Sequence, residues 1–218
     1  TTHEIEKGSM TLVDEARALT LYNAMSGAQE QSGGSAANSA FGFAMLGGSA
    51  AFSGKLADDE VGNSFVANLR SGNVQFTGTI AADGPASARS MIFVTPDAQR
   101  SMNTYLGASL TMTDASIQDD ITAKFIYLEG YLFDAPDGPA IFAKAAQLAL
   151  ETRAALSLTL SDSWCVERHK DALSTFIRDH VSILFSNQDE IQALLGTDDD
   201  DTIASFAREI DELIVTKG

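Results

Sequence analysis

From Thr113 onward the sequence alternates between helical and strand patterns, and this alternation limits the possible folds more than any other feature. Runs such as Phe125-Ile-Tyr-Leu and Ile183-Leu-Phe are apolar at successive positions, as in strands that helices cover on both faces. We expect strands over 124–129, 155–160, 181–185 and 212–216, with helices over 113–120, 137–152, 169–179, 187–195 and 201–211. Strands that alternate with helices form a parallel sheet, so the sequence predicts a doubly wound, mostly parallel α/β fold.

The first half of the chain shows the same pattern until the middle interrupts it. Asp14 is a suitable N-cap for a helix that ends near Met25, and Asp58-Asp59-Glu60 places negative charge at the start of another. Between these two helices we expect a further helix over 40–46 and a strand over 50–56. Short β-rich runs at 74–80, 88–95 and 100–106 are separated by turn residues, which predicts antiparallel hairpins inserted into the α/β pattern.

The charge balance excludes several classes of partner. The chain holds 30 acidic and 14 basic residues, a formal net charge of −16. Such a surface repels nucleic acids and anionic lipids, so we expect neither a nucleic acid nor a membrane as partner. No apolar run approaches the roughly 18 residues of a membrane span, and no signal peptide opens the chain.

The single cysteine, Cys165, suits a reducing compartment, so we expect a cytoplasmic protein. Cys165 could be a catalytic thiol only if His169 shared its helix face.

Three segments near the N-terminus form a recognisable series. They are Gly33-Gly-Ser-Ala-Ala-Asn38, Leu46-Gly-Gly and Gly54-Lys-Leu-Ala-Asp-Asp-Glu-Val-Gly62. The series resembles the N-terminal signature of PfkB-family (ribokinase-like) kinases, with Ala57 where a glycine is common. Glycines at 33 and 34 let the backbone approach a ligand closely, and Ser35 follows them. Asn38 can donate to and accept from sugar hydroxyls, although a turn and a simple helix contact would also explain this segment.

Three later segments extend the resemblance. They are Leu158-Thr-Leu-Ser161, similar to an Asn-Leu-Ser stretch of adenosine kinases, Ile183-Leu-Phe-Ser-Asn-Gln-Asp-Glu190, which matches the family's Asn-x-x-Glu motif, and Val215-Thr-Lys-Gly218, which resembles the start of its Thr-x-Gly nucleotide segment. Thr159 replaces the asparagine of the first. The resemblance places Asn187, Thr216 and Gly218 at the nucleotide.

Asn187 and Glu190 lie one helical turn apart, just past a strand end. In that position a carboxylate and an amide can hold the water shell of a Mg²⁺ ion that bridges nucleotide phosphates. A capping box, in which Asn187 is the N-cap and Glu190 its N3 partner, fits equally well, and both can hold at once.

Three further residues are candidate substrate contacts. Arg100 could pair with a phosphate bidentately or could simply be solvated. Glu129 and Tyr131 end a strand at the edge where open α/β sheets bind ligands. There Glu129 could bind sugar hydroxyls and Tyr131 could stack on a base. The segments 4–13 and 74–106 resemble the β lid that PfkB kinases lay across the sugar site.

The resemblance implies an ATP- and Mg²⁺-dependent kinase that phosphorylates a hydroxymethyl group of an adenosine-like nucleoside. A ribokinase- or fructokinase-type sugar kinase and a non-catalytic ligand-binding relative are the alternatives, and both monomer and homodimer stay open. The family's catalytic base is an aspartate in a Gly-Ala-Gly-Asp motif, which is absent from these 218 residues. We therefore assign no catalytic residue in this chain and expect 1–218 to be a single ribokinase-like domain, truncated at both ends.

Overall fold

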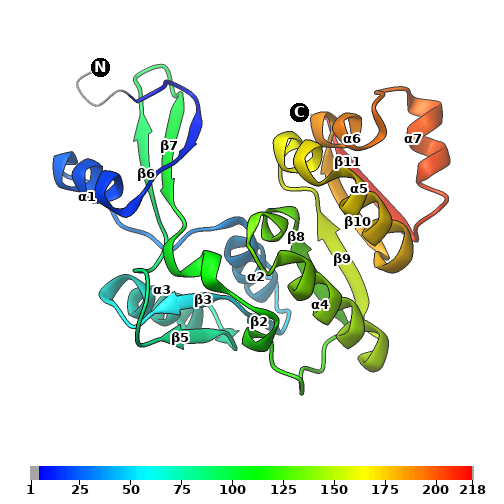
Figure 1. The fold of residues 1–218 in the computed structure, drawn as a ribbon, viewed down its shortest axis with the longest axis horizontal. Helices are drawn as coiled ribbons and strands as arrows, with labels where there is room; N and C mark the ends of the chain where they lie inside the picture. Colours follow the sequence, from blue (N-terminus) through cyan, green and yellow to red (C-terminus); the bar gives the residue numbers. More distant parts are fainter. Residues whose placement is uncertain (1–4, 218) are drawn as a thin grey trace. The chain divides into compact units, whose positions relative to one another are not determined.

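The computed structural model describes residues 5–217. The chain divides into two compact units, which meet in the sequence between Met112 and Thr113, and each is described by itself (Figure 1). The first unit contains β1 (Met10–Leu12), α1 (Glu15–Ala24), α2 (Ser35–Met45), β2 (Ala50–Phe52), β3 (Lys55–Ala57), α3 (Glu60–Ser71), β4 (Val74–Phe76), β5 (Thr79–Ala81), β6 (Arg89–Val94), β7 (Arg100–Tyr105) and the 3-10 helix η1 (Gly107–Thr111).

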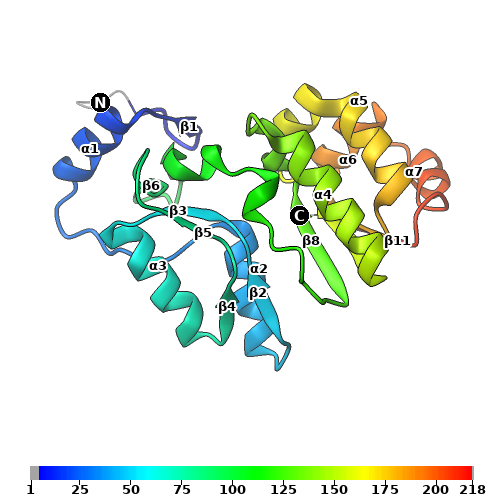
Figure 2. The same ribbon diagram turned by 60° about the horizontal axis from the view of Figure 1, so that its bottom comes forward.

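Parallel strand pairs and the helix between them form one part of the first unit. Strand β2 pairs with β4, and β3 pairs with β5, both in parallel. Helix α3 lies between the two strands of each pair in the sequence, as the crossover that parallel pairing requires. Figure 2 shows α3 running beside these strands. Asp59 caps this helix by accepting a hydrogen bond from the N–H of Gly62 at 2.7 Å.

The other part of the first unit is a three-stranded sheet in the order β1-β7-β6. Strands β6 and β7 form an antiparallel hairpin, and β1 adds to β7 in parallel. Helix α1 covers one face, where Ala18 and Leu21 pack against Met91. Of the segments expected to form a lid, 10–12, 89–94 and 100–105 join this sheet, whereas 74–81 does not, and residue 4 lies outside the described residues. That the sheet acts as a lid, and that 1–218 is a single domain, stay predictions.

The second unit is a four-stranded parallel sheet with its connecting helices. It contains the 3-10 helix η2 (Asp114–Ser116), β8 (Phe125–Glu129), the 3-10 helix η3 (Gly130–Asp134), α4 (Gly138–Thr152), β9 (Ala155–Thr159), α5 (Ser163–His180), β10 (Ile183–Asn187), α6 (Gln188–Leu195), α7 (Asp200–Phe206) and β11 (Glu212–Thr216). The strand order is β11-β10-β9-β8, and every neighbouring pair is parallel. The predicted α/β class and parallel sheet are confirmed.

One face of this sheet is the centre of the unit's core. Leu128, Leu158 and Leu184 lie side by side in the register and are buried. They pack in one cluster with Phe142 of α4 and Ile177 of α5, as well as with residues of α6. Strands added in one direction by right-handed crossovers place their connecting helices on the same face, which explains this arrangement.

Three expectations about elements were wrong. The segment 113–120 is not a helix: η2 makes a single turn, in which the Ser116 hydroxyl accepts a hydrogen bond from the N–H of Thr113 at 3.3 Å. Polar side chains that bind nearby backbone compete with helix formation in this way. The expected strand 50–56 is two short strands, and 74–81 pairs in parallel across α3 rather than as a hairpin.

Among the helices of the described part, none has both the length and the apolar character needed to cross a membrane.

Candidate functional site

The carboxyl ends of the parallel strands in the second unit carry five of the eleven predicted site residues. Glu129 ends β8, Asn187 ends β10 and Thr216 ends β11, with Asn187 directly opposite Thr216 in the register. Because parallel strands end at the same edge, these side chains share one edge of the sheet. Tyr131 and Glu190 follow directly in η3 and α6. The fold therefore brings five of the predicted residues to a single edge, and Gly218 lies outside the described residues.

Asn187 and Glu190 form a complete capping box at the start of α6. The N–H of Glu190 donates to Asn187 Oδ1 at 2.8 Å, and Glu190 in turn accepts from the N–H of Asn187 at 3.0 Å and from its Nδ2 at 2.7 Å. Glu190 is only 6% exposed. Burial raises the pKa of this carboxyl above its usual value. The capping interpretation of the sequence is confirmed, while the metal interpretation stays a prediction.

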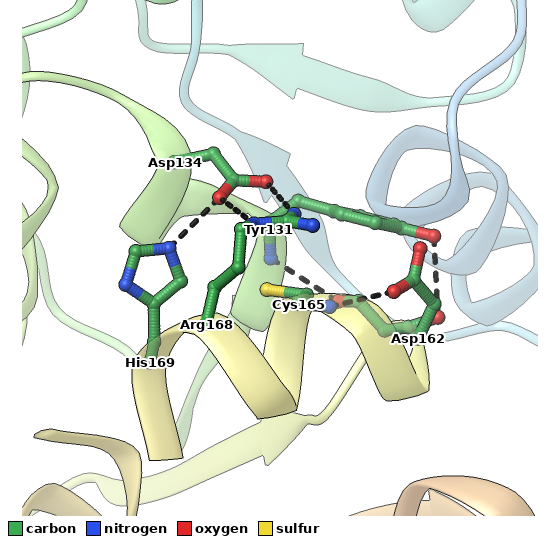
Figure 3. Close-up of polar contacts among 7 residues, drawn as sticks. Tyr131, Asp134, Asp162, Cys165, Arg168 and His169 are labelled. Carbon is green, nitrogen blue, oxygen red and sulfur yellow. Dashed lines mark hydrogen bonds and ion pairs between the residues drawn. The ribbon is translucent and has the colours of Figure 1, made fainter. Parts of the chain in front are cut away.

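Tyr131 is held at the end of β8 by the turn that follows β9 (Figure 3). Its hydroxyl donates to the carbonyl of Ser161 at 3.2 Å, and its N–H donates to the Ser161 hydroxyl at 3.4 Å. Burial raises the pKa of the Tyr131 phenol, so it stays protonated and a donor. Ser161 has φ of 74°, in the left-handed region that side chains rarely adopt. Tyr131 is 38% exposed, so part of the residue is accessible to a ligand.

A second polar cluster joins η3 to α5 and was missed at the sequence level. Asp134 accepts two hydrogen bonds from Arg168, at 3.1 Å from Nε and 2.7 Å from Nη2, and a third from His169 Nε2 at 2.8 Å (Figure 3). Helix α5 leaves helical geometry at His169, where φ is −119°. Asp134 therefore joins the segment after β8 to both residues at the kink of α5.

Helix α5 begins earlier than expected because Asp162 caps it. The Asp162 carboxylate accepts from the N–H of Cys165 at 2.7 Å, so the helix starts at Ser163 rather than at 169. Cys165 is fully buried, and burial raises the pKa of its thiol to about 12. His169 binds Asp134 instead of activating this thiol. The side chain of Cys165 therefore acts as part of the core.

The predicted residues of the first unit gather at the start of α2, with one exception. Gly34 is the N-cap of α2 at φ 98°, a conformation that favours glycine, and the N–H of Asn38 donates to the Gly34 carbonyl at 2.9 Å. Among the described residues, no heavy atom beyond the adjacent residues lies within 4 Å of a Cβ built on Gly33 or Gly34, and Ser35 and Asn38 are exposed. This turn is open for a ligand to approach. Arg100 lies elsewhere in the unit, exposed and opposite Val94 at the turn end of the hairpin.

No group of three or more His, Cys, Asp or Glu side chains within residues 5–217 is arranged to hold a metal ion directly. Glu190 still has lone pairs beyond those that accept from Asn187. The water-mediated metal contact of Glu190 stays a prediction.

Known proteins resemble this chain over most of its length. An adenosine kinase from Sinorhizobium meliloti is 41% identical, with a TM-score of 0.91 over 100% of this chain and 68% of its own. A probable sugar kinase protein from Rhizobium etli CFN 42 is 39% identical, with a TM-score of 0.90 over 99% of this chain and 67% of its own. Fructokinase-1 of Oryza sativa subsp. japonica is 30% identical over 84% of this chain.

The chain spans 59% of the length of the rice fructokinase. The family described as pfkB family carbohydrate kinase matches residues 12–218, which is nearly the whole sequence. The match includes both the glycine turn before α2 and the carboxyl edge of the second sheet. This chain therefore belongs to the pfkB family of carbohydrate kinases.

Proposed function

We propose that the protein containing this chain is an ATP-dependent kinase that phosphorylates a hydroxymethyl group of an adenosine-like nucleoside. The observation that carries this proposal is the meeting of Glu129, Tyr131 and the Asn187–Glu190 pair at one carboxyl edge of a parallel sheet. Open α/β sheets bind their ligands at this edge. The adenosine kinase from Sinorhizobium meliloti, at 41% identity, supports the choice of a nucleoside.

The proposed nucleotide side of the site comprises Asn187, Thr216 and Gly218, with Glu190 acting on Mg²⁺ through water. Bound Mg²⁺ would neutralise charge on the phosphates during transfer. The capping box holds Glu190 in one orientation, because both carboxylate oxygens accept bonds from Asn187. An oriented carboxylate can position metal-bound waters without reorganising when the nucleotide arrives.

By the family resemblance, the proposed acceptor contacts are Gly33, Gly34, Ser35, Asn38 and Arg100 of the first unit, and Glu129 and Tyr131 of the second. Tyr131 offers an aromatic ring whose orientation is held by the hydrogen bond from its hydroxyl to the Ser161 carbonyl. A ring held in this way loses little conformational freedom when a base stacks on it. Glu129 at the end of β8 offers a carboxylate that can accept from sugar hydroxyls.

A sugar kinase is the second candidate, favoured by the 30% identity to the rice fructokinase. Free sugars lack a base, so base stacking on Tyr131 would strengthen the binding of a nucleoside and not that of a sugar. The two candidate functions therefore differ in how much the side chain of Tyr131 contributes to substrate affinity.

Calorimetric titration of the full natural chain with adenosine, ribose and fructose tests the proposal. We expect adenosine to bind most tightly, and the Tyr131→Leu variant to lose adenosine affinity while keeping its affinity for the two sugars. Tyr127→Leu, on β8 and away from its carboxyl end, is the matched control. If fructose or ribose binds tenfold more tightly than adenosine, about 1.4 kcal/mol, the sugar kinase is the better assignment. Binding of any ligand without ADP formation would indicate a non-catalytic relative.

A further inference from the structure

The segment Gly54–Gly62 resembles a family motif, yet the side chains of Asp59 and Lys55 within it bind the protein's own backbone. Asp59 uses one carboxylate oxygen, Oδ1, to cap α3 at Gly62 and the other, Oδ2, to accept from the N–H of Ser87 at 2.9 Å. Ser87 lies just before β6, the first strand of the hairpin. Asp59 thus ties the chain entering the β6–β7 hairpin to the start of α3.

Ser87 is fully buried and reinforces this connection. Its hydroxyl accepts from the N–H of Ala57 at 3.0 Å. A Cβ at Gly62 would lie 2.3 Å from the Ala57 carbonyl oxygen and 2.9 Å from the Ser87 hydroxyl, so only glycine permits this close packing. Burial alone would raise the pKa of Asp59, but its bonds from Ser87 and Gly62 lower it overall, so the carboxylate stays charged at neutral pH.

The chain leaving the hairpin is tied to the same corner. The N–H of Ala108 donates to the Ala86 carbonyl at 2.9 Å, which joins the outgoing chain to the incoming one. Gly107, at φ 47°, permits this approach because a Cβ there would lie 2.1 Å from the Ala86 carbonyl oxygen. Lys55 Nζ then donates to the Thr111 carbonyl at 2.8 Å. We define residues 86–88 and 106–111 as the hairpin base.

We propose that Asp59 and Lys55 are positioning residues. They fix the hairpin base, so that the β6–β7 hairpin is already in place when the acceptor substrate binds. The inference rests on the proposed function, because the acceptor is the ligand that the hairpin would contact through Arg100. Neither residue needs to touch a ligand. A hairpin that is loose before binding must be ordered by the substrate, and that ordering weakens apparent affinity.

The Asp59→Asn variant isolates the connection to Ser87. Asparagine is as good an N-cap as aspartate, so α3 can keep its bond to Gly62. Its NH₂ group cannot accept from the Ser87 N–H, so that bond is lost. Asp58→Asn is the matched control, because Asp58 is exposed and carries the same charge. Its carboxylate accepts a hydrogen bond from Asn63 Nδ2 at 3.3 Å, which is an exposed contact outside the hairpin base. Lys55→Met removes the bond to Thr111 and keeps the apolar stem.

Hydrogen–deuterium exchange of the full natural chain measures directly how stably the hairpin base is held. We expect Asp59→Asn to raise the exchange rate over 86–111 and to leave the rate over 125–216 unchanged. Lys55→Met should raise the exchange rate mainly over 107–111. Asp58→Asn should change neither range. In kinetics, Asp59→Asn should raise KM for the acceptor about tenfold, with kcat and KM for ATP within twofold.

Unchanged exchange over 86–111 in Asp59→Asn would overturn the inference, as would an equal rise over 125–216. A local rise in exchange with an unchanged acceptor KM would overturn the positioning role. If neither adenosine nor fructose is phosphorylated by the unaltered protein, the proposed function fails. In that case, a rise in exchange over 86–111 in Asp59→Asn that is absent in Asp58→Asn would still show that Asp59 holds the hairpin base.

Discussion

At the scale of single residues, the pair Asn187 and Glu190 combines a structural and a proposed functional role. The same carboxylate that closes the capping box is the one proposed to contact metal-bound water. Its burial raises its pKa, so the charged form costs stability, a cost that is absent below the unfolded pKa and appears as pH rises through the folded pKa. Burial of this carboxylate at a cost to stability supports the proposed role for its charge beyond capping.

We expect Glu190→Gln in the full natural chain to lower kcat at least tenfold while changing the melting temperature little. Glutamine loses one acceptor for Asn187 but removes the cost of burying a charge, and the two effects oppose each other. Turnover and thermal melts at pH 7 measure both quantities. Asp189→Asn, exposed in the same first turn, is the control for the change in charge. A large fall in melting temperature with normal turnover would show that Glu190 acts only as a helix cap and not on the metal.

At the scale of elements, the hydrogen bonds that Asp134 accepts from Arg168 and His169 hold η3 against the kink of α5. Burial acts to raise the pKa of Asp134, but the bonds from Arg168 and His169 outweigh it and lower the pKa overall. A lowered folded pKa stabilises the fold above the unfolded pKa of about 3.9, and that stabilisation is lost as pH falls through the folded pKa.

We expect Asp134→Asn to lower the free energy of unfolding by about 1–2 kcal/mol at pH 7, because one oxygen that accepts charged bonds is replaced by a donor. Urea unfolding at pH 7 and at successively lower pH measures the difference from the unaltered protein, which should shrink below pH 4. Asp137→Asn is the control, since Asp137 precedes α4 without a side-chain cap bond. An equal difference at every pH would contradict the charge-based explanation.

Several helix starts held by local bonds could be predicted from the sequence, although the cap of α5 by Asp162 was missed, and bonds between residues far apart in the sequence could not be predicted. Asp14, Asp59 and Asn187 each cap a helix by binding a backbone N–H three residues ahead, so their role is visible in a short stretch. The bond between Asp134 and Arg168 joins residues 34 apart, and that between Ser87 and Asp59 joins residues 28 apart. Neither leaves a periodic signal, so the cluster at α5 and the hairpin base became visible only in the fold.

At the scale of the whole molecule, the candidate site residues lie in both units, whereas the expected catalytic base lies in neither. The glycine turn belongs to the first unit and the Asn187–Glu190 pair to the second. The Gly-Ala-Gly-Asp motif that the family resemblance assigns to the base is absent from the 218 residues.

We therefore expect a polypeptide of only these 218 residues to bind ligand weakly and to transfer no phosphoryl group, because positioning and charge stabilisation supply most of this catalysis. ADP formation with adenosine, ribose and fructose measures the activity, and circular dichroism shows whether the polypeptide is folded. The full natural chain is the positive control. Turnover within tenfold of that control would contradict the assignment of the base.

The strand pairings of the two units also set the order in which they can fold. Strands β6 and β7 are joined by residues 95–99 alone, so this hairpin can close early and with little loss of chain entropy. In the second unit each neighbouring pair is parallel and is separated by at least one helix, so no pair can form before its crossover is in place. Parallel sheets of this kind have high contact order and fold slowly. The first unit closes a longer connection still, because Met10 of β1 pairs with Met102 of β7, so we expect the β6–β7 hairpin to form before the parallel pairs of either unit.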